Sequence, residues 1–179
     1  MQEIHSTDPK IFTKVLSTIS NKLCMITNSN INQVQCLHFY FHLFIFTAVR
    51  KYSKACRYLS QLRDAMGSTE DDEEEKIRAV EVPLKLNMAA CYLATKNWEE
   101  AKTECENVLE IQETNSKAIF RRGQALLGMN DFDAALKDLQ KVRELQPEDK
   151  GVLNEIARAK KMKLDMVQKE KKLYSKMFK

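Results

Sequence analysis

A period of thirty-four residues constrains the fold of this chain more than any other feature of its sequence. When residues 82–115 are aligned above residues 116–149, small, apolar and aromatic residues coincide. The coincident positions are Asn97-Trp98 with Asp131-Phe132, Ala101 with Ala135, Cys105 with Leu139, and Val108 with Val142. Self-similarity at a fixed period of this length is typical of proteins built from stacked structural repeats. The sequence therefore predicts a helical-repeat array.

The composition predicts long helices and cysteines that remain reduced. The chain has 179 residues, of which 44% are hydrophobic, and it contains only four glycines and three prolines. Its five cysteines form an odd set without the spacing of metal ligands, so we interpret them as free thiols and expect neither a zinc site nor a disulfide scaffold. This cysteine usage favours a cytoplasmic protein. The net charge of +4 is modest, and the excess of lysine and arginine lies after Asp149.

Each copy of the repeat has the pattern of two helices joined by a short turn. In the second copy, apolar and small residues recur at helical spacing, stop at residues 128–131, and then resume until Pro147. The resumed stretch contains Phe132 and Ala135, and the first stretch contains Gly123. The first copy follows the same plan but lacks the terminal proline, because Glu113 occupies that place.

Gly123, Phe132, Ala135 and Pro147 in this register resemble the tetratricopeptide repeat, a helix-turn-helix unit of the same length. The resemblance implies an all-α fold with two full repeats and half of another, closed by a long C-terminal capping helix. We expect the following layout: residues 1–46 outside the repeats, 47–66 the second helix of a partial unit, 67–76 an acidic linker, 77–149 two repeat units, and 150–179 a basic C-terminal helix.

The segment before the repeats departs from this pattern. Residues 36–49 carry no charged side chain and are apolar on every face. Fourteen residues are fewer than the ~20 that a membrane-spanning helix needs, so we expect no contact with a membrane. The stretch from Phe39 to Phe46 also has the β-branched and aromatic character of an aggregation-prone strand. We interpret residues 1–46 as a segment that is not native repeat sequence.

Three polar residues in the two full units suggest a peptide-binding site. Asn87 and Arg121 are thirty-four residues apart, so they occupy equivalent positions on successive first helices, and Lys117 lies one helical turn before Arg121. An amide, an ammonium and a planar guanidinium on one stripe are suitable donors for a carboxylate. We predict that Asn87, Lys117 and Arg121 bind the carboxylates of a peptide.

These residues resemble the dicarboxylate clamp of chaperone-binding tetratricopeptide domains. The resemblance implies binding of the acidic C-terminal peptide of heat-shock protein 90 or of its 70-kDa relative. The clamp of that family takes two further donors from the first unit, whereas this chain has Gln33, Cys36 and Leu37 at the corresponding places. The sequence therefore predicts an incomplete clamp that binds such peptides weakly or not at all.

The C-terminal segment is basic, with apolar residues between the lysines. Val152, Ile156 and Ala159 form an apolar stripe that predicts a capping helix, and the lysines after it make calmodulin a candidate partner. Residues 169–178 resemble the segment that closes the repeat domain of large immunophilins of the cyclophilin-40 type, with the FK506-binding type as second choice. Members of that family have a prolyl isomerase domain before the repeats, and we expect that this chain has no room for one.

Three functional hypotheses remain at this stage. The first is a co-chaperone-type adaptor that binds proteins and not nucleic acids. The second is a fragment of a peptidyl-prolyl cis-trans isomerase whose catalytic domain is absent. The third is a remnant without function. The sequence offers no nucleophile with a base, no phosphate-binding glycine loop and no set of metal ligands. We therefore expect neither catalysis nor a cofactor.

Overall fold

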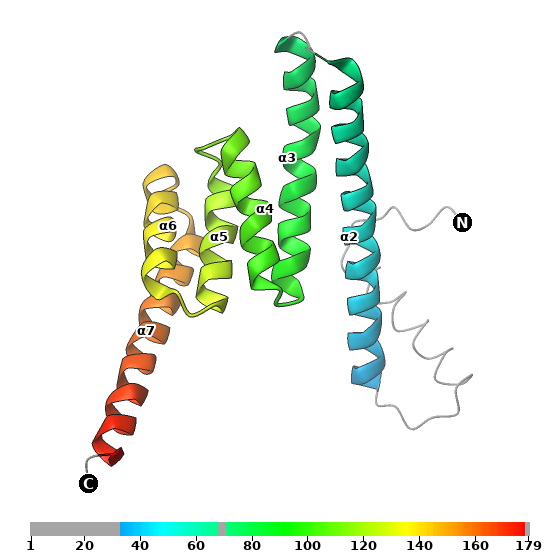
Figure 1. Cartoon of the computed structure of the whole chain (residues 1–179). Coiled ribbons are helices and arrows are strands. Elements are labelled where there is room, and N and C mark those ends of the chain that lie inside the picture. Colours follow the sequence, from blue (N-terminus) through cyan, green and yellow to red (C-terminus); the bar gives the residue numbers. More distant parts are fainter. Residues whose placement is uncertain (1–32, 68–70, 178–179) are drawn as a thin grey trace. The chain divides into compact units, whose positions relative to one another are not determined.

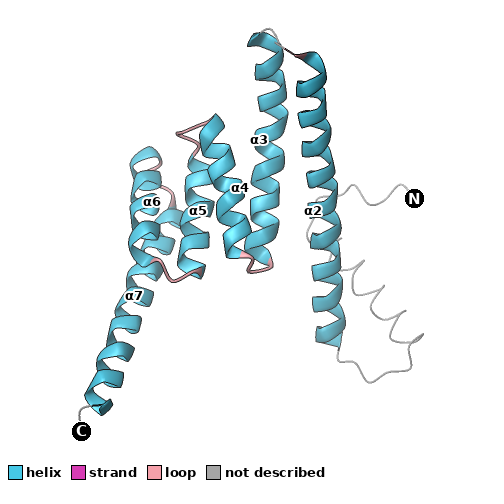
Figure 2. Cartoon of the chain, in the orientation of Figure 1, coloured by secondary structure: helices cyan, strands magenta, loops and turns pink. Residues whose placement is uncertain are grey.

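The computed structural model describes residues 33–67 and 71–177, which form helices and no strand (Figures 1 and 2). The helices are α2 (Gln33–Met66), α3 (Asp71–Ala94), α4 (Trp98–Ile111), α5 (Ser116–Gly128), α6 (Phe132–Leu145) and α7 (Lys150–Met177). The chain divides into two units, Met1–Thr47 and Ala48–Lys179, and the repeats lie in the second unit. The predicted all-α helical array is confirmed.

Helices α3 to α6 form two successive helix-turn-helix pairs. Helix α3 packs against α4, α4 against α5, and α5 against α6, while α7 packs mainly on α6 (Figure 1). The first helices of the two pairs, α3 and α5, also contact each other. This order of contacts is the one expected when each unit buries its apolar side against the next.

The two turns within the pairs have the same geometry, thirty-four residues apart. Lys96 and Asn130 both adopt a positive φ, of 62° and 65°. The next residue then donates a backbone hydrogen bond to the end of the preceding helix: Asn97 N lies 2.9 Å from Tyr92 O, and Asp131 N lies 2.9 Å from Leu126 O. These bonds satisfy carbonyl groups that a helix end leaves unpaired. The backbone conformation of the two turns therefore repeats with the same thirty-four-residue period as the sequence.

The main core cluster joins the second repeat to the capping helix. It contains Ile119, Leu126, Leu127, Phe132, Ala135, Leu139, Val142, Val152, Ile156 and Ala159. A smaller cluster of Val82, Leu86, Val108 and Ala118 joins the two repeats. Because the predicted stripe of Val152, Ile156 and Ala159 lies in the main cluster, the first part of α7 covers the apolar side of the last repeat.

Cys105 is fully buried on α4, and this burial raises the pKa of its thiol to about 12. The pKa of this thiol is higher in the folded chain than in the unfolded chain, where it is 9.0. The thiol therefore stabilises the fold at pH values below 9.0, and this stabilisation is lost as the pH rises towards 12. We expect Cys105 to lower the free energy of unfolding by about 1.4 kcal/mol between pH 8 and pH 10. Urea unfolding of the unchanged chain and of Cys105→Ala at both pH values measures this, since the alanine variant should lack this part of the decrease. Equal decreases in both proteins would contradict the prediction.

Two segments before the repeats are helical in the structure. The apolar run and the expected second helix of the partial unit belong to one helix, because α2 continues without a break from Gln33 to Met66. The acidic run is also largely helical, because α3 begins at Asp71, well before the predicted end of the linker at residue 76. Carboxylates at a helix N-terminus interact favourably with the helix dipole, which explains why this acidic sequence starts a helix.

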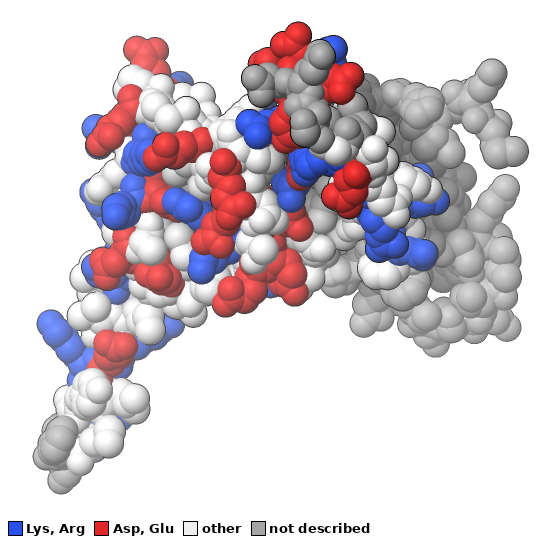
Figure 3. Space-filling model, turned by 45° about the horizontal axis from the view of Figure 1, so that its top comes forward, with Lys and Arg blue, Asp and Glu red and all other residues white. Residues whose placement is uncertain are grey.

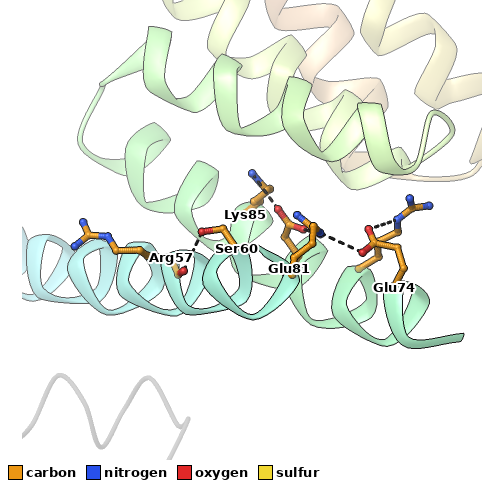
Figure 4. Close-up of polar contacts among 7 residues, drawn as sticks. Arg57, Ser60, Glu74, Glu81 and Lys85 are labelled. Atoms are coloured by element: carbon orange, nitrogen blue, oxygen red, sulfur yellow. Dashed lines mark hydrogen bonds and ion pairs between the residues drawn. The ribbon is translucent and has the colours of Figure 1, made fainter. Parts of the chain in front are cut away.

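Ion pairs join the end of α2 to the acidic start of α3 (Figure 4). Arg63 lies 3.1 Å from Glu74 and 2.9 Å from Glu81, and Arg78 lies 3.0 Å from Glu74. Hydrogen bonds from Arg78 and Arg63 lower the pKa of Glu74. The acidic run therefore contributes pairing partners for Arg63 in addition to negative charge.

None of the described helices combines the length and the apolar character needed to cross a membrane.

Candidate functional site

The predicted site is centred on one face of α5. Lys117, Arg121, Gln124 and Gly128 are spaced by four, three and four residues, so they lie along the same side of the helix. Asn115 caps the N-terminus of the helix, because its side chain accepts a hydrogen bond of 3.0 Å from Ala118 N. Lys117 is exposed and Arg121 is half-buried. The two cations are thus one turn apart on an anchored helix.

Arg121 connects α5 to α3. Its Nη1 donates a hydrogen bond of 2.6 Å to the carbonyl oxygen of Leu86, which fixes the guanidinium beside the residue that precedes Asn87. A guanidinium has five N–H donors, so this bond leaves several of them for a ligand. The positive charge of Arg121 also opposes the rise in the pKa of Cys91 that burial causes, which agrees with its place against α3.

Asn87 lies on α3, next to the carbonyl group that holds Arg121. Its side chain is exposed, as is that of Lys117. Among the described residues, neither side chain has a hydrogen-bond or ion-pair partner. The structure thus places an amide and a guanidinium on neighbouring helices, with an ammonium one turn away, and leaves donors of all three accessible.

The same face of α5 continues into a cavity of about 460 Å³. Its walls come from the end of α3, the start of α4, the end of α5 and the middle of α7, and they include Trp98, Gln124, Leu127, Gly128 and Met162. Gln124 donates a hydrogen bond of 2.9 Å to Glu155 on α7, which forms part of the wall. The cavity combines apolar side chains with polar ones, so it suits a side chain of mixed character.

Trp98 fits into this cavity wall because Gly128 has no side chain. A Cβ atom at Gly128 would lie 2.3 Å from Cδ2 of the Trp98 ring, a distance that no real contact reaches. In the sequence, Gly128 was interpreted only as part of the turn after α5. The missed signal was the tryptophan itself, since a large aromatic ring on one helix needs a small residue on the helix that it crosses.

Arg122, next to Arg121, has a structural role. It forms two hydrogen bonds, of 2.7 and 2.8 Å, to both carboxylate oxygens of Asp138 on α6, and these bonds raise the pKa of Arg122. Asp138 is the one polar residue in the buried set of the described chain. The two adjacent arginines therefore point to different partners: Arg121 to α3 and Arg122 to α6.

The other half of the predicted clamp is not described. Gln33, Cys36 and Leu37 belong to α2, but their side chains lie outside the described ones. Within the described residues, no group of three or more His, Cys, Asp or Glu side chains could hold a metal ion. The visible face in Figure 3 shows positive and negative side chains interspersed over the repeats, so no patch of one sign marks that face.

The model of the family described as tetratricopeptide repeat matches residues 116–149, which are α5, its turn and α6. This chain carries a tetratricopeptide repeat domain. The peptidyl-prolyl cis-trans isomerase FKBP4 of Bos taurus is 36% identical over 131 residues, which are 73% of this chain and 28% of the bovine protein. The chain thus spans little more than a quarter of the length of that relative.

Solved structures with the same fold include a domain of an immunophilin. The C-terminal tetratricopeptide-containing domain of a putative FK506-binding protein from Plasmodium falciparum has a TM-score of 0.63 and 22% identity, covering 87% of this chain and 90% of that domain. The Hsp90 co-chaperone Cns1 from Saccharomyces cerevisiae has a TM-score of 0.59 and 20% identity, covering 97% of this chain and 46% of that one. The resemblance to the repeat domain of large immunophilins is confirmed, with relatives of the FK506-binding type.

Proposed function

We propose that this chain is a protein-interaction module of the co-chaperone type, which binds the acidic C-terminal peptide of heat-shock protein 90 or of its 70-kDa relative. Asn87, Lys117 and Arg121 would bind the carboxylates of the peptide. The observation that carries the proposal is the hydrogen bond from Arg121 to Leu86 O, because it orients the guanidinium beside Asn87 while leaving further donors accessible.

The arrangement suits a terminal carboxylate better than a neutral ligand. A fixed guanidinium forms paired hydrogen bonds to a carboxylate, and the exposed Lys117 and Asn87 add donors on either side. Because Arg121 is already oriented by Leu86, binding does not have to order this side chain, which lowers the entropic cost. The cavity at Trp98 and Met162 would then receive a side chain of the peptide upstream of its terminus.

A titration with a peptide that ends in Met-Glu-Glu-Val-Asp tests the proposal. We expect saturable binding that weakens with added salt, because the contacts are between charged groups. We expect Lys117→Ala and Arg121→Ala each to weaken binding by about tenfold or more, since a charge-assisted hydrogen bond contributes about 1.5–3 kcal/mol. Isothermal titration calorimetry or fluorescence anisotropy measures both effects.

Two controls make this titration specific. Lys137→Ala removes an exposed lysine of α6, away from the proposed site, and should leave the affinity unchanged. The same peptide with an amidated C-terminus should bind much more weakly to the unchanged chain, because it lacks the terminal carboxylate. If Lys117→Ala and Lys137→Ala have the same affinity as the unchanged chain, the proposed site is wrong.

We also propose a cytoplasmic location for this chain. The described cysteines support it, because Cys56, Cys91 and Cys105 are free thiols. Fluorescence microscopy of the tagged chain in cells tests this location, and retention in the secretory pathway would contradict it.

A further inference from the structure

The side-chain amide of Gln124 has one fixed orientation. Helices α5 and α7 contact each other, and there Nε2 of Gln124 donates a hydrogen bond of 2.9 Å to Oε1 of Glu155. Glu155 also accepts hydrogen bonds of 3.1 and 3.2 Å from Nη1 of Arg158. Because an ionised carboxylate only accepts hydrogen bonds, the amino group of the amide has to face Glu155. The carbonyl oxygen of Gln124, Oε1, therefore points away from Glu155.

This oxygen is an acceptor beside the proposed carboxylate site. Gln124 is half-buried, lies on the same side of α5 as Lys117 and Arg121, and contributes to the wall of the cavity. Among the residues that the structure describes, none donates a hydrogen bond to its Oε1. The lysine and the arginine offer only donors, so Gln124 adds the opposite kind of group to this face of α5.

We propose that Oε1 of Gln124 accepts a hydrogen bond from a backbone N–H group of the bound peptide. This inference rests on the proposed function, because it concerns the peptide whose terminal carboxylate Arg121 would bind. Gln124 follows Arg121 by three residues of helix, which is about 4.5 Å of rise. An extended peptide advances by about 3.3 Å per residue, so the acceptor lies at the level of the last two residues of the peptide.

A backbone acceptor at this place restricts the class of ligand. The clamp residues recognise carboxylates, whereas Gln124 recognises the peptide bond next to the terminal carboxylate. A backbone N–H that loses its water on binding needs a new acceptor, and Oε1 of Gln124 supplies one. Proline has no backbone N–H, so the preferred ligand is an acidic peptide without proline at the position that faces Gln124. Glu155 acts through Gln124 as a positioning residue, because it fixes the direction of the amide.

Calorimetric titration of the full chain with N-methylated peptides tests this contact. The ligands are the peptide ending in Met-Glu-Glu-Val-Asp and two forms of it, with a methyl group on the backbone nitrogen of either the valine or the aspartate. We expect one of the two methylated peptides to bind about fivefold more weakly to the unchanged chain, because it cannot donate to Gln124. Gln124→Met should bind the unmodified peptide about fivefold more weakly, and the same methyl group should then cost little further affinity.

The combination of variant and peptide separates the contact from indirect effects. Methylation also changes the free peptide, and Gln124→Met also removes the bond to Glu155, but each of these effects alone lowers affinity by the same factor with either partner. Equal losses from methylation in the unchanged chain and in Gln124→Met, with binding still sensitive to Arg121→Ala, would overturn this inference alone. No binding of the unmodified peptide would reject the proposed function and this inference with it.

Two further variants test the role of the amide orientation. Gln168→Met changes an exposed glutamine of α7 that does not line the cavity, and it should leave the affinity for all three peptides unchanged. Glu155→Ala should weaken binding of the unmodified peptide by about two- to threefold, because the amide of Gln124 is then free to turn. Glu155→Ala should add no further loss to Gln124→Met, and a full additional loss in the double variant would contradict a role of Glu155 through Gln124. Thermal unfolding of each variant checks that α5 and α7 stay packed.

Discussion

Replacing Asp138 by alanine is expected to lower the free energy of unfolding by about 2–3 kcal/mol. The change leaves the guanidinium of Arg122 without the two hydrogen bonds that hold it against α6. Breaking a fully buried ion pair by removing one partner costs about 3–5 kcal/mol, and the smaller figure applies here because the side chain of Arg122 is 27% exposed. Urea unfolding followed by circular dichroism measures the loss.

A double substitution separates the ion pair from other effects of the change. Arg122→Ala leaves Asp138 buried without a partner, so it should also be destabilising, while Arg122→Met combined with Asp138→Leu should recover much of the stability because no buried charge remains. Lys102→Ala provides a control, since Lys102 and Glu106 form an exposed pair at 3.9 Å and its loss should change stability little. Equal effects of Lys102→Ala and Asp138→Ala would contradict a structural role for the buried pair.

This buried pair also shows why the structure of the repeats was predictable and some of its contacts were not. The thirty-four-residue period is a local signal, because each unit repeats the same helices, the same turn and the same apolar positions. It therefore predicted the helical array of the repeats. The pairing of Arg122 with Asp138 joins two helices, and the two residues are sixteen positions apart in the sequence. No sequence pattern marks them as a pair.

The segment before the repeats differs for another reason. The apolar residues 36–49 fit a buried strand or a buried helix equally well, and periodicity cannot distinguish the two when every face is apolar. The acidic run was interpreted from its charge as a linker, although the same charge favours the start of a helix and gives Arg63 its partners at Glu74 and Glu81.

The helix positions of the candidate residues were predictable, but the contacts that these residues make were not. The register placed Asn87 and Arg121 at equivalent positions on successive helices, and the structure has α3 and α5 in contact as this requires. No residue pattern indicated that Arg121 donates a hydrogen bond to the carbonyl group of Leu86, because a backbone acceptor does not depend on residue type. It also did not reveal the cavity beside the site, since its walls come from four different helices.

Replacing Gly128 by alanine is expected to disturb both the stability of the fold and this cavity. The new Cβ atom would lie 2.3, 2.5 and 2.7 Å from three atoms of the Trp98 ring, so the ring or the end of α5 has to move. Overpacking of this kind costs about 1–3 kcal/mol, and we expect the upper part of that range because a rigid indole cannot yield as a flexible side chain would. Thermal unfolding measures the loss.

Gly123→Ala is a suitable comparison on the same helix, because its Cβ atom would lie 3.2 Å from the flexible side chain of Leu139, which can adjust. We expect this variant to be less destabilised than Gly128→Ala.

Combining Gly128→Ala with Trp98→Ala should cost less stability than the sum of the two single changes, since the methyl group then occupies space that the ring has left. Because Trp98 and Gly128 both line the cavity beside Arg121, Gly128→Ala should also weaken the binding of a peptide that fills this cavity, while a peptide truncated to its last two residues should bind as it does to the unchanged chain. Additive effects of Gly128→Ala and Trp98→Ala would show that the close approach of these two residues does not limit the packing of α5 against α4.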